Sequence, residues 1–328
     1  MPEGTQNRLT ALVTGLSGQD GSFLAELLLE KGYEVTGVVR EEPDASLGAA
    51  DHLRGQVDLV RGDLLDAASL NSAVRNGQPH ELYHLAAPSF VPDSWEHPAK
   101  TLAAIADATA VLLEAVRDHS PRTRAFVASS GAIFGDAGES PQHEQTPCRP
   151  RNPYAVAKLA AHNLVGRIRD HDALYACSGI LYNHESERRP EAFVPRKITR
   201  AAAAIKLGLA SEVVLGDLDA VRDWSFAGDI MRGAWLMLQQ DEPDDYILAS
   251  GVPHTVADLA EVAFAHVGLT ARDHIRVDPE LQRTHERTPV VGDPTRARER
   301  LGWEPTLTFE QLIARMVDAD LQELAGAD

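Results

Sequence analysis

A tyrosine and a lysine four residues apart, Tyr154 and Lys158 in "NPYAVAKLAAH", form the pair with the clearest catalytic potential in the sequence. The segment 153–169 has helical periodicity, so both side chains should lie on one face of a helix. A lysine beside a tyrosine stabilises the phenolate form and can also hold the ribose of a nicotinamide cofactor. The phenol can then exchange a proton with a substrate hydroxyl while a hydride moves to or from the nicotinamide. Ser130, at the end of the strand expected in "RAFVASS", can hydrogen-bond the same substrate oxygen.

A glycine-rich loop, "TGLSGQDG", supplies a phosphate-binding element for such a reaction. Gly15, Gly18 and Gly21 stand between the apolar strand "LTALVTG" and a helical pattern. Glycines in this position allow a tight turn, close approach of the backbone to a pyrophosphate, and close packing of helix on strand. The helix N-terminus at Gln19 and Asp20 offers N–H groups and the positive end of a dipole to phosphate. Taken alone, the glycine loop could be an ordinary turn between a strand and a helix. Together with the serine and the tyrosine–lysine pair, it predicts a dinucleotide-dependent enzyme.

The second expected strand indicates which dinucleotide binds. Arg40 ends that strand, where it can stack on adenine and pair with a 2′-phosphate, which favours NADP. Glu41 could repel that phosphate or accept ribose hydroxyl hydrogen bonds, so NAD stays an alternative. Both could also be solvated loop charges. Four further residues that follow expected strands are assigned to the cofactor site: Asp63, Leu64, Leu85 and Ala86. Of these, Asp63 and Leu64 should lie beside the adenine.

Apolar strands alternate with helices through the first half of the chain, as in a parallel sheet covered on both faces. The expected fold class is therefore α/β, a Rossmann-type doubly wound sheet with a smaller C-terminal substrate-binding lobe. From "NHESERRPEAFVPRK" onward, basic loops, helices and short strands replace this alternation. We predict interleaved domains: residues 1–181 and 224–250 bind the dinucleotide, and residues 182–223 and 251–328 form a nucleotide-sugar-binding lobe. Length supports this interpretation, since 328 residues can bury a sizeable core.

Composition limits the partners. The net charge is -18 at pH 7, a poor match for nucleic acid or anionic membranes. No apolar run approaches membrane-spanning length, and the N-terminal stretch has no apolar signal region. Two cysteines fit a reducing compartment. We therefore expect a cytoplasmic protein with no metal site, no nucleic-acid partner and no membrane partner.

Longer stretches carry a family resemblance. "ALVTGLSGQDGSFLAELLLEKGYEV", "NPYAVAKLAAH", "GILYNHESERRPEAFVPRKITRA", "LGDLDAVRDW" and "GDPTRARERLGWEP" resemble the extended short-chain dehydrogenase/reductase superfamily and, within it, the GDP-mannose 4,6-dehydratase family. The resemblance covers nearly the whole chain. It implies a nucleotide-diphosphate sugar as substrate, GDP-linked in this family. Matched position by position, it implies that the following residues bind the substrate, with Arg188 and Ser89 nearer the sugar or cofactor: Ser89, Asn183, Arg188, Val194, Lys197, Arg222, Arg283 and Glu286. Arginines clustered in an acidic protein independently suit a phosphate clamp, although surface charges are the alternative.

One position departs from the family pattern in a way that matters for chemistry. The family's dehydration base is a glutamate two residues after the catalytic Ser/Thr, and in "SSGAIFG" that position is Ala132. A methyl group cannot abstract a proton, and losing a general base costs on the order of a hundred- to ten-thousand-fold. Ser130, Tyr154 and Lys158 would retain oxidation and reduction at C4 of the sugar. This pattern looks more like that of nucleotide-sugar 4-epimerases.

Three functions are consistent with these residues. The first prediction is NAD(P)-dependent oxidoreduction at C4 of a GDP-type hexose, as an epimerase or 4-keto-reductase without dehydration. The alternative is a GDP-mannose 4,6-dehydratase with a substitute base, for which Glu144, Glu185 and Asp93 are candidates. A second alternative is a non-catalytic paralogue that binds nucleotide sugars. The helices expected at 102–117 and 154–169 resemble the superfamily's dimer-forming pair, which predicts a homodimer or homotetramer.

Overall fold

The structure, a computed structural model, describes residues 8–40, 46–281 and 288–326. The chain divides into two compact units. Unit 1 comprises Met1–Ile133, Pro150–Ile180 and Met231–Tyr246, and unit 2 comprises Phe134–Arg149, Leu181–Ile230 and Ile247–Asp328. The interleaved domains expected from the sequence stay a prediction.

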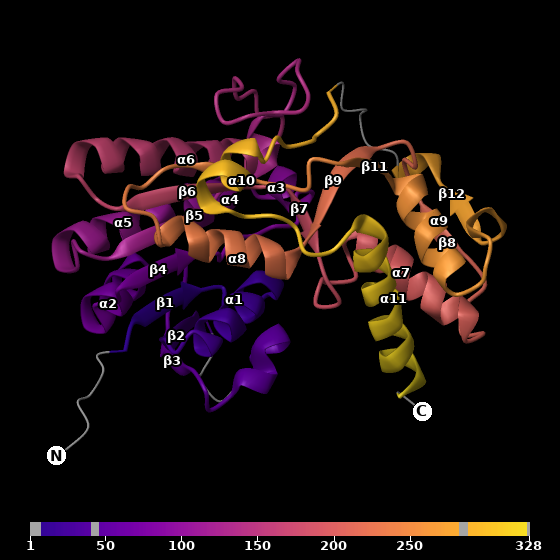
Figure 1. Cartoon of the computed structure of the whole chain (residues 1–328), viewed down its shortest axis with the longest axis horizontal. Helices are drawn as coiled ribbons and strands as arrows, with labels where there is room; N and C mark the ends of the chain where they lie inside the picture. Colours follow the sequence, from indigo (N-terminus) through magenta and orange to yellow (C-terminus); the bar gives the residue numbers. More distant parts are fainter. Residues whose placement is uncertain (1–7, 41–45, 282–287, 327–328) are drawn as a thin grey trace. The chain divides into compact units, whose positions relative to one another are not determined.

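A parallel sheet organises unit 1 (Figure 1). Its strand order is β10-β6-β5-β4-β1-β2-β3, and neighbouring strands from β3 to β6 pair in parallel. The strands are β1 (Thr10–Thr14), β2 (Glu34–Val39), β3 (Asp58–Arg61), β4 (Glu81–His84), β5 (Arg124–Ala128), β6 (Ala176–Leu181) and β10 (Tyr246–Leu248). The order reverses between β1 and β4, and open parallel sheets bind ligands at the carboxyl edge of such a reversal. The expected Rossmann-type α/β class is confirmed.

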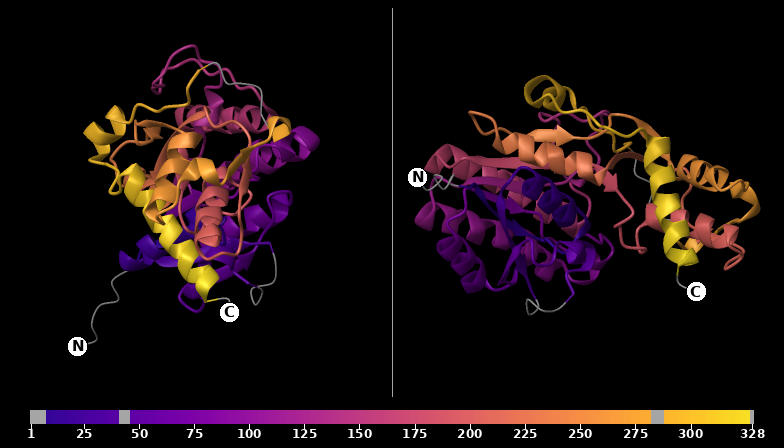
Figure 2. Two further views of the ribbon diagram at one scale, coloured as in Figure 1. Left: turned by 90° about the vertical axis from the view of Figure 1, so that its right-hand side faces the viewer. Right: turned by 60° about the horizontal axis from the view of Figure 1, so that its bottom comes forward.

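Helices cover both faces of this sheet, as two further views also show (Figure 2). They are α1 (Gln19–Glu30), α2 (Ala67–Gly77), α3 (Asp93–Glu96), α4 (Pro98–Leu102), α5 (Ala108–His119), α6 (Pro153–Asp172) and α8 (Ala227–Leu238). Helices α2, α5 and α6 share one apolar core with the strands, in which Leu12, Leu82 and Leu112 are fully buried. Strand side chains alternate between faces, so Val13 and Tyr83 point to the opposite core. Burial on both faces explains why these strands are continuously apolar.

The helix expected at 102–117 is interrupted. A π-helical turn, Ala103–Asp107, joins α4 to α5. There the buried Ile105 packs against Ala157 and Ala161 of α6, and Tyr154 and Ala87 border the same cluster. Such turns insert a residue without ending the helix. The apolar pattern runs through the turn, so periodicity alone gives no sign of it.

Unit 2 contains two small sheets and a separate core. Strands β7 (Asn183–Glu185), β9 (Val221–Phe226) and β11 (Pro253–Thr255) form one sheet with β9 in the centre, and β8 (Val213–Leu215) pairs with β12 (Ile275–Val277). The helices are α7 (Val194–Lys206), α9 (Val256–His266), α10 (Thr295–Leu301) and α11 (Phe309–Ala325). Helices α7, α9 and α11 pack around buried Phe264, Ile313 and Met316. Within the described residues, no helix has both the length and the apolar character needed to span a membrane.

Candidate active site

The three loop glycines of unit 1 have different surroundings. Gly15 has φ +79°, and a Cβ there would lie 2.9 Å from the Ala86 nitrogen. A Cβ on Gly21 would lie 2.2 Å from the carbonyl oxygen of Gly15. Gly18 differs, because its Cβ would meet only that same oxygen, at 3.4 Å, and otherwise open space. Gly15 and Gly21 therefore permit close backbone packing, whereas Gly18 leaves a cradle that a side chain would fill.

This cradle fits the diphosphate of a dinucleotide. Gly18 is the N-cap of α1 and provides no side-chain cap for the helix amides. Those amides and the helix dipole favour an anion in the open space before Gly18. Gln19 is buried and donates from Nε2 to Asp20 Oδ1 at 3.0 Å. Thr14 fixes the neighbouring strand end, because its carbonyl accepts the Leu85 amide at 3.3 Å and its hydroxyl accepts the Ala86 amide at 3.2 Å.

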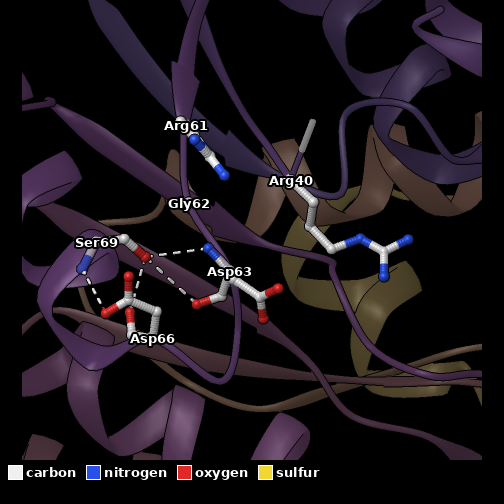
Figure 3. A pocket seen from close by; sticks show the side chains of 6 residues that line it. All are labelled: Arg40, Arg61, Gly62, Asp63, Asp66 and Ser69. Carbon is white, nitrogen blue, oxygen red and sulfur yellow. Dashed lines mark hydrogen bonds between the residues drawn. The ribbon is translucent and has the colours of Figure 1, made fainter. Parts of the chain in front are cut away.

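A cavity of unit 1, of about 330 Å³, lies at the ends of β2 and β3 (Figure 3). The residues that line it are Arg40, Arg61, Gly62, Asp63, Asp66 and Ser69. Arg40 and Asp63 are the two that the sequence assigns to the adenosine end of the cofactor; Arg61, Asp66 and Ser69 are additional. Leu64 is half-buried against the core beneath α2 and is not among the lining residues. Glu41, the residue that would favour NAD, lies outside the described residues.

Tyr154 and Lys158 lie one turn apart at the start of α6. Asn152 caps this helix by accepting the Ala155 amide at 2.8 Å. The Lys158 ammonium lies 5.9 Å from the centre of the Tyr154 ring and donates to the carbonyl of Ala128, the last residue of β5, at 2.6 Å. Lys158 is only 6% exposed. Burial lowers its pKa to about 8, partly opposed by the negative charge of Asp20.

His84 is a buried residue of this region that sequence reasoning overlooked. Burial lowers its pKa to about 3, with a further lowering contribution from the charge of Lys158, so the imidazole is neutral at pH 7. Its Nδ1 lies 2.8 Å from the Thr14 hydroxyl. A neutral ring beside Lys158 lets the lysine keep its proton more easily than a second cation would.

Ser130 leads directly from β5 into a short 3-10 turn, Gly131–Ile133. Its Oγ accepts the Ala132 amide at 3.2 Å, which leaves the hydroxyl hydrogen available for donation. Helix α6 packs against this turn, so Ser130 and the Tyr154–Lys158 pair belong to one region of unit 1. The Ala132 side chain is half-buried in the turn.

The acids considered as substitute bases have other partners or surroundings. Glu144 accepts the Ile247 amide at 3.1 Å and lies 3.6 Å from Arg296, both residues of unit 2. Glu185 is fully buried, 3.1 Å from Arg189. Asp93 is exposed at the first position of α3. Two of these carboxylates are therefore engaged in ion pairs within unit 2.

The expected substrate residues of unit 2 lie mainly on β7, β9 and α7. Asn183 stands opposite Trp224, two residues from Arg222 on the adjacent strand. Arg222 donates to the Val221 carbonyl at 2.7 Å. Val194 and Lys197 are exposed in the first turns of α7, and the Arg188 amide donates to Ser186 Oγ at 3.0 Å. Ser89 is an exposed residue of unit 1. Arg283 and Glu286 lie outside the described residues.

Asp223, next to Arg222, organises this strand and is not singled out by the sequence. The buried carboxylate accepts the Ser250 hydroxyl at 2.6 Å and the amides of Ser250, Gly251 and Gly292 at 2.8, 2.9 and 3.2 Å. Burial raises its pKa, and these hydrogen bonds oppose the rise. Asp223 thereby ties β9 to two loops that are distant in the sequence. Among the described residues, no group of three or more His, Cys, Asp or Glu could hold a metal ion.

The parallel sheet, the glycine loop and the Tyr154–Lys158 pair define a short-chain dehydrogenase/reductase of the extended type. The chain belongs to the GDP-mannose 4,6-dehydratase family, since the model described as "GDP-mannose 4,6 dehydratase" matches residues 12–316. It is 45% identical over 327 residues to GDP-mannose 4,6 dehydratase 1 of Arabidopsis thaliana, covering 96% of this chain and 90% of that protein. It is 39% identical over 342 residues to the Homo sapiens GDP-mannose 4,6 dehydratase, covering 96% and 92%.

Solved structures agree on the fold. A Thermotoga maritima UDP-glucose 4-epimerase with UDP-glucose matches with a TM-score of 0.85 and 25% identity, covering 96% of this chain and all of that one. RMD from Pseudomonas aeruginosa, complexed with NADPH, matches with a TM-score of 0.82 and 25% identity over 96% and 99% of the chains. The family and these relatives establish an enzyme of nucleotide-sugar chemistry. The names of the sequence relatives support the 4,6-dehydratase alternative better than the first prediction, a reaction without dehydration.

Proposed function

We propose that this protein uses NADP to oxidise a GDP-linked hexose at C4. The observation that carries the proposal is the Tyr154–Lys158 pair on α6, a helix that packs against the turn following Ser130, in the same unit as a glycine cradle suited to a dinucleotide. The NADPH in the RMD complex supports the choice of cofactor. The names of the family and its relatives support the GDP-linked sugar.

The chain's own residues account for proton transfer. NADP, when bound, supplies the hydride acceptor at C4 and can return the hydride. The Tyr154 phenolate takes the proton of the C4 hydroxyl, and the Ser130 hydroxyl donates a hydrogen bond to the same oxygen. The Lys158 ammonium, with a pKa of about 8, is mostly protonated at pH 7 and stabilises the phenolate. The hydrogen bond from Lys158 to the Ala128 carbonyl fixes the position of the ammonium group.

The fate of the oxidised sugar distinguishes two candidate reactions. Loss of water between C5 and C6 is the reaction that the relatives' names support. That step needs a base for the C5 proton, which would have to be a residue other than Ala132. Delivery of a hydride to C4 is the second candidate: an epimerase returns the hydride that it removed, whereas a 4-keto-reductase delivers one from NADPH to a 4-keto sugar. It is favoured by Ala132 and by the ion pairs that engage Glu144 and Glu185.

Mass spectrometry separates the two candidates. The protein is incubated with NADP and GDP-hexoses in deuterated water. Loss of one water with deuterium on carbon establishes dehydration, and single Glu144→Gln, Glu185→Gln and Asp93→Asn variants then locate the base. An isomer of unchanged mass without deuterium on carbon establishes return to C4. A protein that binds GDP-sugars but yields no product, also from 4-keto sugars with NADPH, is the non-catalytic paralogue.

We also propose that the unit 2 residues bind the nucleotide diphosphate. Arg222 and Lys197 supply positive charge, and Asn183, on the strand next to Arg222, supplies an amide. The clustering of Asn183 and Arg222 on adjacent strands supports this assignment. The measurement is GDP affinity: Arg222→Gln should weaken it about tenfold or more, because a charge-assisted hydrogen bond is lost. Unchanged affinity would remove Arg222 from the site.

A homodimer or homotetramer through the helices at 102–117 and 154–169 is the proposed assembly, in a cytoplasmic setting consistent with two free cysteines. Leu102 and Val156 expose 42% and 47% of their surface on these helices, and Trp95 exposes 64% just before them. Exposed large apolar side chains on neighbouring elements suit a protein interface. Light scattering should show a dimer or tetramer for the wild type and a smaller species for Val156→Asp.

A further inference from the structure

The cavity at the ends of β2 and β3 is lined by a second arginine, Arg61, besides the Arg40 expected there. We propose that Arg61, together with Arg40, binds the 2′-phosphate of NADP and sets the preference of this protein for NADP over NAD. The proposal rests on the proposed use of NADP and adds to it a specificity-determining residue.

Strand register brings the two arginines to one place. Strands β2 and β3 are parallel, with Val39 opposite Arg61, and the Gly62 amide donates to the Val39 carbonyl at 2.9 Å. Arg40, one residue beyond Val39, therefore leaves the sheet at the same carboxyl edge as Arg61. In Figure 3 the Arg61 side chain extends from its strand towards the side on which Arg40 lies. Strand β1 pairs with β2, with Thr14 opposite Val38, so the glycine loop begins at this edge too.

Gly62 allows close packing at the strand ends. A Cβ on Gly62 would lie 2.6 Å from Cγ1 of Val38, so a larger residue there would have to displace the Val38 side chain. With glycine at this position, the cavity is lined by charged and polar groups from both strands. A compact anion held by two guanidinium groups suits such a space, because each guanidinium can donate two parallel hydrogen bonds.

The two carboxylates of the cavity are engaged by the backbone. Asp66 caps α2, with Oδ1 accepting the Ala68 and Ser69 amides at 3.1 and 3.3 Å. Asp63 Oδ1 accepts the Leu65 amide at 2.8 Å. These bonds hold the acids in the turn that leads into α2 and disperse part of their charge. The formal charges of the two arginines and the two aspartates cancel, so a phosphate in this cavity depends on direct hydrogen bonds from both guanidinium groups.

The test measures binding of each ligand to the full-length protein by calorimetry. The ligands are NADP, NAD, and the fragments 2′,5′-ADP and 5′-ADP, so that no turnover is required. Arg61→Gln should weaken NADP and 2′,5′-ADP about tenfold to hundredfold and leave NAD and 5′-ADP nearly unchanged. Arg40→Gln should also weaken the binding of NADP and 2′,5′-ADP and leave that of NAD and 5′-ADP nearly unchanged. Arg75→Gln, an exposed arginine later on α2 that does not line the cavity, is the matched control and should change nothing.

Three results overturn the proposal. They are equal weakening of NADP and NAD by Arg61→Gln, no change in either, and a wild type that prefers NAD. Thermal unfolding of each variant shows whether a loss reflects folding, and Arg61→Lys, which keeps one charge, should recover part of the NADP affinity. Failure of the proposed function would give a different result. The wild type would then bind neither dinucleotide, or would bind them without oxidising the sugar at C4.

Discussion

The buried ammonium of Lys158 makes the stability of the cofactor-free protein depend on alkaline pH. Burial lowers the pKa of this group to about 8 from its ordinary 10.5. Between these values the unfolded chain holds the proton more strongly than the folded chain does. Folding stability therefore rises with pH across this window, and the full cost of the charge applies below pH 8.

The magnitude follows from the two pKa values. At about 1.4 kcal/mol for each pH unit, the difference between 10.5 and about 8 corresponds to about 3 kcal/mol in total. About 2 kcal/mol of this should appear between pH 7 and pH 9.5. Lys158→Met removes the titrating group and leaves the other lysines, tyrosines and cysteines in place. The free energy of unfolding of the wild type should therefore gain about 2 kcal/mol relative to the variant over that range.

Urea unfolding followed by circular dichroism measures this difference at pH 7, 8, 9 and 9.5. Lys100→Met is the matched control, because Lys100 is an exposed lysine of α4 in the same unit. Its difference from the wild type should stay constant with pH. A constant difference for Lys158→Met as well would refute the reasoning, since it would mean that the Lys158 ammonium titrates as it does in water.

Further predictions concern catalysis and the glycine loop. Tyr154→Phe should slow hydride transfer, followed at 340 nm in single turnover, by on the order of a hundredfold or more without changing GDP-sugar affinity; an unchanged rate would exclude the phenol as acid or base. Gly18→Ala should weaken cofactor binding without lowering the melting temperature, whereas Gly21→Ala should lower the melting temperature, because its Cβ would lie 2.2 Å from a backbone oxygen. A lower melting temperature for Gly18→Ala but not for Gly21→Ala would contradict the roles assigned to the two glycines. Ala132→Glu should raise the yield of dehydrated sugar in deuterated water, and an unaltered product ratio would show that this position does not limit water loss.

Much of unit 1 could be predicted from the sequence because the relevant signals are local. The α/β class follows from alternating apolar strands and helices. Tyr154 and Lys158 share a helix face because they are four residues apart, and the structure places the ammonium 5.9 Å from the ring. Arg40 and Asp63 follow their strands directly, so both could be assigned to the sheet edge where the cavity lies.

Features that depend on register or on distant contacts could not be predicted in this way. Arg61 shares a cavity with Arg40 only because β3 pairs with β2 in a particular register. Asp223 acquires its role from loops near residues 250 and 292. The π-helical turn at Ile105 keeps the apolar pattern of an ordinary helix. His84 gives no signal in the sequence, because its neutrality results from burial beside Lys158.

The most direct test of the central claim uses GDP-mannose labelled with deuterium at C4 and the NADP-loaded protein. We predict slower turnover than with unlabelled sugar, and deuterium retained on carbon in the product. The label should move to C6 if water is lost, or stay at C4 if the hydride returns to the opposite face. Tyr154→Phe should suppress both outcomes. Product formed with the deuterium released to water would contradict hydride transfer at C4 as the function of this site.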